Sequence, residues 1–283
     1  MASFTNFATL SYNGGTTNSN IVTGEILEAL TAVKTAVSAN YSAGDRITYA
    51  LSLVNTGTAA ITDYTVTDNL GGYTVGTNTV YPLAYNAGTV RYYINGVLQA
   101  APTVTAGPPL TVTGLTVPAG GSAVLIYETT ATPVAPLATG SSITNTATIT
   151  GGGLTPPITA QATVETANSA DLTISKALSP TTVTENGQIT YTFVISNTGN
   201  TEATATGNVV VTDTFAPILR NIAVTYNGTA WTEGTNYTYN AATGVFTTLA
   251  GQITVPAASF TQNTDGTFTV TPGTATLVIT GTV

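Results

Sequence analysis

The chain has 283 residues, a net charge of −8 at pH 7, only 6% charged residues, and neither Cys nor His. Five Lys and Arg residues provide no basic surface for nucleic acid, and the missing thiol and imidazole groups exclude disulfides and the commonest catalytic nucleophiles, bases and metal ligands. We therefore expect no cofactor and no metal, and an enzyme acting on an external substrate is the least favoured function class.

The length suits two domains, and the composition favours β-structure. Thr, Val, Tyr and Ile recur in short alternating runs that Gly, Asn and Pro interrupt, so we predict an all-β fold of two tandem β-sandwiches. No apolar run is long enough to span a bilayer, and the N-terminus shows no signal peptide. A surface of Thr, Asn and Gly suggests an extracellular protein.

The first predicted element resembles a strand from the middle of the chain. SFTNFATLSYNGG at 3–15 matches SSITNTATITGGG at 141–153, and the shared positions include Asn6 with Asn145 and Ala8 with Ala147. In the later copy this strand ends a repeat. A closing strand therefore stands at the front of the chain.

The next stretch, EILEALTAVKTAVSA at 25–39, is helical by propensity alone. However, LTAVKTAV at 30–37 aligns with LTISKALS at 172–179, which carries β-branched residues. The same offset of 142 residues aligns DRITYALSLVNTG at 45–57 with GQITYTFVISNTG at 187–199, and TVTDNL at 65–70 matches VVTDTF at 210–215. We therefore predict a strand here, with tertiary context overriding propensity.

The repeats define the domains. We expect a donor strand at 1–13, a linker at 14–27, a first domain at 28–151, a linker at 152–169 and a second domain at 170–283. The second repeat reaches ATLVITGTV at 275–283 without a counterpart of SITNTATIT. We expect residues 1–13 of a neighbouring subunit to supply that strand, which gives a head-to-tail homopolymer.

The two lysines of the chain occupy equivalent positions, Lys34 and Lys176. In a strand, residues two apart share a face, so both lysines lie on the apolar face of their strands. The same parity places four further polar residues among apolar neighbours: Asp68, Asp213, Asn145 and Asn6. A buried ammonium is costly unless it is paired, so Lys and Asp should meet. The face of the donor strand comprises Phe4, Asn6, Ala8 and Leu10.

This pattern resembles the immunoglobulin-like conserved repeats of bacterial surface proteins and the isopeptide-forming domains of collagen adhesins and Gram-positive pilins. The resemblance implies an autocatalytic amide bond between Lys34 and Asn145 within the chain. It also implies a bond between Lys176 and Asn6 of a neighbouring chain, with Asp68 and Asp213 as the assisting acids. It places a fibre subunit of two immunoglobulin-like sandwiches, such as a pilus or a spore appendage, on a bacterial cell or spore surface.

Two alternatives stay open. The lysines also suit edge strands as gatekeepers, with Asp68 and Asp213 as turn residues. The rival function is a stalk or adhesin that binds carbohydrate or host protein through loops near 71–91 or 231–245. A cluster of exposed aromatic side chains on one loop end would support that function, and the candidates are Tyr73, Tyr81, Tyr85, Trp231 and Tyr237.

Overall fold

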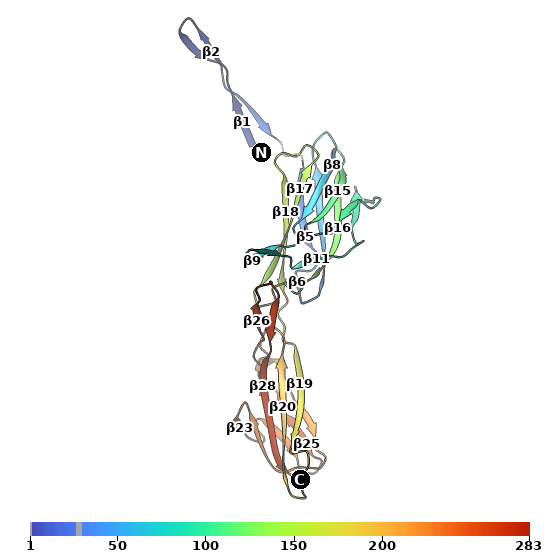
Figure 1. Cartoon of the computed structure of the whole chain (residues 1–283), viewed down its shortest axis with the longest axis vertical. Coiled ribbons are helices and arrows are strands. Elements are labelled where there is room, and N and C mark those ends of the chain that lie inside the picture. Colours follow the sequence, from blue (N-terminus) through green and yellow to red (C-terminus); the bar gives the residue numbers. More distant parts are fainter. Residues whose placement is uncertain (1, 27–29) are drawn as a thin grey trace.

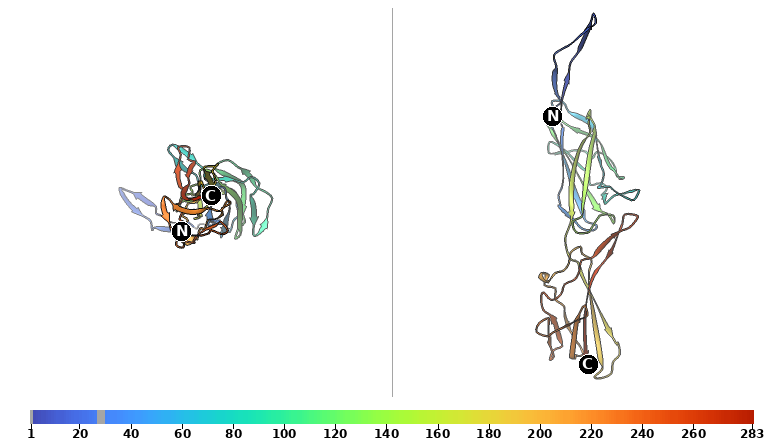
Figure 2. Two further views of the ribbon diagram at one scale, coloured as in Figure 1. Left: turned by 90° about the horizontal axis from the view of Figure 1, so that it is seen from below. Right: turned by 90° about the vertical axis from the view of Figure 1, so that its left-hand side faces the viewer.

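The computed structural model of the chain describes residues 2–26 and 30–283, with side chains for 4–24 and 30–283. Strands dominate throughout, and the one helix among these residues is a single 3₁₀ turn, η1 (Ala205–Gly207). The all-β prediction is confirmed. The molecule is elongated, with an N-terminal arm, a first sandwich and a second sandwich in a row (Figures 1 and 2). Within the described ranges no helix is long and apolar enough to cross a membrane.

The N-terminal arm is a long β-hairpin that projects from the first sandwich (Figure 1), and each of its two halves consists of two successive strands. Its strands are β1 (Ala2–Asn6), β2 (Thr9–Tyr12), β3 (Gly15–Asn18) and β4 (Val22–Ile26). β1 pairs with β4 and β2 pairs with β3, both antiparallel. The turn uses Asn13 and Gly14 at positive φ, as a tight hairpin requires. Residues 14–27, which we expected as a linker, thus contain the return strands of this hairpin.

The first sandwich consists of two facing sheets, each with six strands. One sheet has the order β13-β12-β16-β7-β5, with β11 also on β16. Its strands are β5 (Leu30–Ala36), β7 (Arg46–Asn55), β11 (Leu83–Tyr85), β12 (Arg91–Ile94), β13 (Val97–Leu98) and β16 (Ser122–Ala131). The other has the order β14-β15-β8-β17-β18-β6. Its strands are β6 (Asn40–Tyr41), β8 (Ile61–Asp68), β14 (Thr103–Thr105), β15 (Leu110–Val117), β17 (Ser142–Gly151) and β18 (Ile158–Thr166). A separate hairpin joins β9 (Tyr73–Val75) to β10 (Asn78–Val80).

The segment 152–169, assigned to a linker from the sequence, contains β18. β18 pairs with β17 along its whole length and lies against β5 of the opposite sheet. It therefore closes one edge of the first sandwich. Alternate side chains of β18 are buried, which accounts for the small apolar residues at its inward positions.

The second sandwich repeats one sheet of the first and only part of the other. The sheet β19-β20-β28-β22-β23 has the same order as β5-β7-β16-β12-β13, and β21-β25-β24 corresponds to β8-β15-β14. The strands are β19 (Leu172–Ser179), β20 (Gln188–Asn197), β21 (Thr212–Thr214), β22 (Arg220–Tyr226), β23 (Thr229–Trp231), β24 (Tyr237–Asn240), β25 (Val245–Thr248) and β28 (Gly273–Thr282). Between residues 170 and 283, no strand corresponds to β17 or β18.

The stretch with helical propensity is a strand wherever the structure describes it. Residues 30–36 form β5, and residues 27–29 lie outside the described part of the chain. Lys34 stands opposite Leu51, and Lys176 stands opposite Phe193, so the offset of 142 residues holds in the pairing register as well. Strand pairing and burial of alternate side chains therefore outweigh the helical propensity of Ala and Leu.

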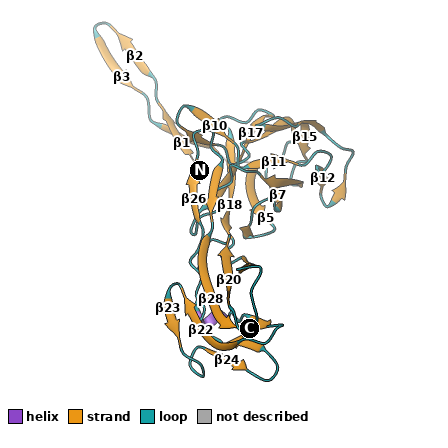
Figure 3. Ribbon diagram, turned by 60° about the horizontal axis from the view of Figure 1, so that its bottom comes forward, coloured by secondary structure: helices purple, strands orange, loops and turns teal. Residues whose placement is uncertain are grey.

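A hairpin from the second sandwich reaches the first, and it comprises β26 (Ser259–Gln262) and β27 (Phe268–Thr271) (Figures 1 and 3). Gln262 Nε2 donates a hydrogen bond of 2.8 Å to the Tyr73 hydroxyl of the first sandwich. On the other side of the joint, Asn200 Nδ2 donates to the carbonyls of Leu137 and Ala167. These bonds hold the two sandwiches end to end.

Each sandwich has its own hydrophobic core, and a buried asparagine from the repeated Asn-Thr-Gly motif holds a loop against each core. Asn55 is fully buried, and its Nδ2 donates to the carbonyls of Ala59 and Pro118 at 2.8 and 3.0 Å. Its Oδ1 accepts the backbone N–H of Gly57. Asn197 makes the same three kinds of bond in the second sandwich. The motif is thus structural, because one buried carboxamide makes three hydrogen bonds to the backbone of the adjoining loops.

Replacing Asn55 with Ala should destabilise the first sandwich by about 2 to 4 kcal/mol, because three hydrogen bonds from the buried carboxamide to the backbone are lost together. Urea unfolding of the full chain measures this change. Asn78→Ala, on the exposed hairpin β9–β10, is the matched control and should change stability by no more than about 0.5 kcal/mol. An equally small effect of Asn55→Ala would contradict the structural role.

Candidate functional site

The first candidate site lies in the core of the first sandwich, where three strands bring together Lys34, Asp68 and Asn145. Lys34 comes from β5 in one sheet, while Asp68 on β8 and Asn145 on β17 come from the other. Lys34 Nζ lies 2.5 Å from Asp68 Oδ2, and both side chains are at most 1% exposed. Asp68 stands opposite Ala147, two residues from Asn145 on the same face. The structure therefore gathers all three predicted residues in one buried region.

Two tyrosines form the wall of this site. Tyr49 and Tyr127 face each other on β7 and β16 with stacked rings, and Lys34 Nζ lies 4.9 and 5.8 Å from their ring centroids. The Tyr127 hydroxyl donates a hydrogen bond to Asp68 Oδ2, which is also the oxygen that Lys34 contacts. The backbone N–H of Leu70 donates to the other oxygen, Oδ1. Asp68 is thus held in place from three sides.

Neither tyrosine was identified as a site residue from the sequence. Their signal is their parity: Tyr49 in DRITYAL and Tyr127 in AVLIYE both fall on the inward positions of their strands. That parity distinguishes a core residue from a surface residue. It does not show which core residue stands next to the lysine, because the answer depends on how the two sheets face each other.

The side chain of Asn145 has no hydrogen-bond partner of normal geometry, although it is completely buried. The hydroxyls of Tyr49 and Tyr127 face it without making such a bond. Leaving a carboxamide unsatisfied in a core costs about 1 to 3 kcal/mol per group, and native cores generally avoid that cost. Stability alone therefore does not explain an unsatisfied Asn in the same core region as a buried Lys.

Burial lowers the pKa of Lys34 to about 8, although the neighbouring charge of Asp68 and their hydrogen bond act in the opposite direction. The ammonium form is destabilised because the apolar core and the two rings replace its water. Burial raises the pKa of both Tyr49 and Tyr127, so their hydroxyls stay protonated. Lys34 is therefore closer to a neutral, nucleophilic amine than an exposed lysine is.

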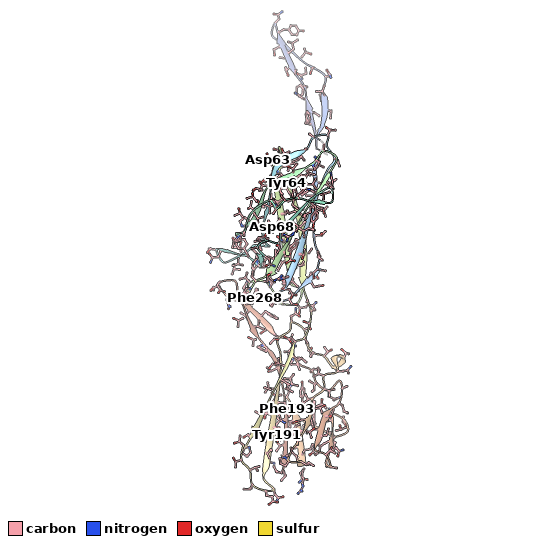
Figure 4. All side chains as sticks on the ribbon, turned by 90° about the vertical axis from the view of Figure 1, so that its right-hand side faces the viewer. Asp63, Tyr64, Asp68, Tyr191, Phe193 and Phe268 are labelled. Carbon is pink, nitrogen blue, oxygen red and sulfur yellow. The ribbon has the colours of Figure 1, made fainter. Side chains whose placement is uncertain are left out.

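The second candidate site contains the same pair without the asparagine. Lys176 on β19 forms an ion pair with Asp213 on β21. Its Nζ lies 4.5 Å from the ring centroid of Tyr191 and 5.4 Å from that of Phe193, both labelled in Figure 4. The side chain of Lys176 is 40% exposed and that of Asp213 is 18% exposed. The pair is therefore assembled but open to solvent.

The opening at this site results from the two strands that the second sandwich lacks. β5 buries alternate residues, but β19 is exposed along nearly its whole length. Its apolar residues Ile174 and Leu178 are 55% and 38% exposed. Within residues 170–283, β21 pairs with β25 on one side only, whereas β8 pairs with strands on both sides. One face of the second sandwich therefore leaves β19 and the side chain of Lys176 exposed.

The predicted donor face is exposed and lies far from Lys176. Phe4, Asn6, Ala8 and Leu10 are all exposed, and Phe4 and Leu10 are 55% and 62% accessible. The arm and the second sandwich are at opposite ends of the molecule (Figures 1 and 2). Within one chain, Asn6 is therefore not brought to Lys176.

The aromatic residues considered for an adhesive surface do not gather. Tyr73, Tyr81 and Tyr85 belong to the first sandwich, while Trp231 and Tyr237 belong to the second. All five are buried or half-buried, and Trp231 stacks on Tyr226. Across residues 2–26 and 30–283, no group of His, Cys, Asp or Glu side chains is arranged to hold a metal ion.

No family model and no curated protein matches the chain. Among solved structures, the major pilin subunit BcpA of Bacillus cereus shares 14% identity at a TM-score of 0.35, over 96% of this chain and 73% of that one. The pilus backbone of Streptococcus pneumoniae shares 14% identity at a TM-score of 0.36, over 86% of this chain and 55% of that one. The collagen-binding subdomain of the Enterococcus faecalis surface protein ACE shares 10% at 0.31, over 49% and 99%. At this level of similarity the function has to be inferred from the chain's own residues.

The two lysines should differ strongly in chemical reactivity. In a monomeric Asn6→Ala, Asn145→Ala chain, where both amines stay free, an amine-reactive acylating reagent should modify Lys176 at least about tenfold faster than Lys34, because only Lys176 reaches solvent and only Lys34 is fully buried. Peptide mass spectrometry measures both rates in one sample, with the N-terminal amine as an internal reference. Equal rates would contradict the difference in burial.

Proposed function

We propose that this chain is the structural subunit of an extracellular fibre, and that it polymerises head to tail by donating its N-terminal strand to the second sandwich of a neighbouring subunit. Isopeptide bonds then lock the fibre, from Lys34 to Asn145 within each chain and from Lys176 to Asn6 between chains. One observation carries the proposal. The first sandwich holds a complete buried set of Lys, Asp and Asn, whereas the second holds a partly exposed Lys and Asp, and residues 170–283 contain no strand that would bear the Asn.

The arm offers the missing strand with its reactive residue in place. β17 carries Asn145 on the face that also buries Ile143, Ala147 and Ile149. The arm presents Phe4, Asn6, Ala8 and Leu10 at the matching positions, and all four are exposed. A strand added beside β21 would pair its free edge through backbone hydrogen bonds, which provide the affinity in strand donation.

With the arm hairpin formed, closure within one chain is out of reach. Val22, the cross-strand partner of Asn6, precedes Leu30 by eight residues, which extend over at most about 28 Å. The first sandwich has ten-residue strands, about 33 Å long, and Lys176 lies beyond them in the second sandwich (Figure 1). The contact is therefore between copies, and a head-to-tail contact of this kind propagates into a fibre unless it closes into a ring.

The proposed chemistry is the same at both sites and is balanced. The lysine passes one proton to the aspartate, which gives a neutral amine and a neutral carboxyl group. The amine nitrogen attacks the carboxamide carbon of the asparagine while the carboxyl group donates a hydrogen bond to its oxygen. The C–N bond to the amide nitrogen then breaks. That nitrogen takes up a proton that the lysine nitrogen loses, and ammonia leaves.

We place this fibre outside a bacterial cell or on a spore, as the resemblance of the motif implies. The chain has no cysteine, so it forms no disulfides, and amide crosslinks would provide covalent stability instead. The self-directed bond formation is the only catalysis we propose. The stalk or adhesin function receives no support from the scattered, largely buried aromatic residues.

The two asparagines should control different bonds. Asn6→Ala should abolish the ladder of oligomers that survives boiling in detergent and should keep the intrachain loss of about 17 Da, the mass of one ammonia. Asn145→Ala should lose the intrachain change and keep the ladder. Intact-mass spectrometry and denaturing gels report both outcomes, and Thr5→Ala is the control beside Asn6.

Two results would contradict this assignment separately. Monomers at the unmodified mass, from a chain with no substitution, would eliminate the covalent bonds. Fibres that persist after deletion of residues 2–12 would eliminate strand donation by the arm.

The rate of the intrachain bond should depend on pH in one direction. The ion pair of Lys34 and Asp68 contains the same number of protons as the neutral pair, so no proton from solvent is needed to form the reactive state. Above the Lys34 pKa of about 8, one proton leaves the pair, and the carboxyl group has none to donate. On refolding from urea, the mass loss should proceed at a constant rate from pH 6 to about 8 and slow by up to about tenfold per pH unit above it.

Asp68→Asn is the control and should refold without forming the bond. A rate that instead rises about tenfold per unit through pH 8 would show that the neutral amine alone is limiting. That result would contradict the role of Asp68 as the proton donor.

A further inference from the structure

Resting on the proposed function, we propose that the donated element is the whole arm hairpin, residues 2–26, and not its first strand alone. The return strand β4 takes the place beside β19 that β18 takes beside β5. The acceptor groove is therefore two strands wide, and the second strand seals Lys176. The partner that fits this surface is the hairpin of a second copy of the chain.

The acceptor lacks two strands, not one. In the first sandwich, β17 supplies Asn145 and β18 lies against β5, the strand that carries Lys34. With both strands in place, the side chain of Lys34 is completely buried, whereas the side chain of Lys176 is 40% exposed without them. A single added strand pairs β21 but leaves β19 without the neighbour that β5 has in β18.

The β1–β4 part of the arm and the β17–β18 hairpin share their cross-strand pairs. Offsets of 139 residues in the first strand and 140 in the second relate the two hairpins, and the paired positions then agree in kind. Ser3 opposite Glu25 corresponds to Ser142 opposite Glu165, Thr5 opposite Thr23 to Thr144 opposite Thr163, and Asn6 opposite Val22 to Asn145 opposite Ala162. Thr is common here, but Glu occurs only seven times in 283 residues, so the Ser–Glu match is the more specific one.

The apolar positions of the return strand β4 also correspond to those of β18. In the first sandwich, Ile143 opposes Val164, and both are buried. In the arm, Phe4 opposes Gly24, and its ring lies over Gly24 so closely that a Cβ there would collide with it. One aromatic ring therefore covers both positions, as a ring commonly does across from a strand glycine.

The face formed by Phe4, Asn6 and Val22 is two strands wide and open to solvent. Phe4 and Val22 are 55% and 56% exposed, although each lies in a formed hairpin, opposite Gly24 and Asn6 respectively. A hairpin that served only to hold β1 would need no apolar residue at position 22. Ala162, the equivalent of Val22, is buried in the first sandwich, while Thr163, the equivalent of Thr23, is exposed.

Sealing by β4 has a chemical consequence. The reaction requires a neutral amine, and a solvated lysine stays protonated at neutral pH. With β4 in place, Lys176 would lie in surroundings like those of Lys34, between aromatic rings and away from water. Asn6 therefore reaches the groove on one strand, and the other strand makes the amine reactive.

The test compares two neighbouring substitutions in the full chain. Val22→Asp places a charge on the face that enters the groove, and Thr23→Asp places the same charge on the face that stays in solvent. We expect Val22→Asp to slow formation of the detergent-resistant ladder at least about tenfold, and Thr23→Asp to change it less than about twofold. Val22→Thr keeps the shape and strand propensity of Val and should still slow it about threefold, which guards against simple loss of the hairpin.

A second readout does not depend on bond formation. In chains that also carry Asn6→Ala, acylation of Lys176 should become at least about tenfold slower in the assembled fibre than in the monomer, and Val22→Asp should remove that protection while Thr23→Asp keeps it. Equal behaviour of Val22→Asp and Thr23→Asp in both assays would overturn the inference. If deletion of residues 2–12 still abolishes fibres in that case, single-strand donation stands and only the role of β4 fails.

Discussion

The buried ion pair between lysine and aspartate is the constraint on which the rest of this structure depends. Moving an ammonium and a carboxylate into an apolar core costs several kcal/mol per ion, and their attraction repays it only with good geometry. In the first sandwich that geometry exists: Asp68 accepts from Lys34, Tyr127 and a backbone N–H. Asn145 beside it remains unsatisfied. The buried ion pair and the unpaired carboxamide both cost stability, so a reaction explains their presence in this core better than packing does.

The same pair in the second sandwich lacks that enclosure, and the difference follows from topology. The strand order of one sheet is repeated, but the other sheet stops at β21. Lys176 and Asp213 form their ion pair where both side chains are partly exposed to solvent, so the ion pair there costs less. In the proposed fibre, the second site is therefore shielded from water only when a neighbouring subunit adds its strands.

The sequence indicates much of this arrangement, because a strand fixes side-chain direction by parity. That rule places Lys34, Asp68 and Asn145 on inward faces, and the internal repeat corrects the helical propensity of residues 30–37. The return strands β3 and β4 are harder to predict. Residues 15–26 are rich in Gly, Thr and Asn and alternate weakly, so their strand state comes from pairing with β1 and β2. Tyr127 was missed because its contact with Asp68 depends on how the two sheets face each other.

The proposed bonds also determine how a fibre would carry load. Asn6 and Lys34 are 28 residues apart, and Asn145 and Lys176 are 31 residues apart. With both bonds formed, the covalent path runs from Asn6 to Lys34, crosses to Asn145 and continues to Lys176, where the next subunit begins. Residues 35–144 and 177–283 lie outside that path. Tension along the fibre then passes through the joints and bypasses both sandwich cores, so neither core has to resist unfolding for the fibre to hold.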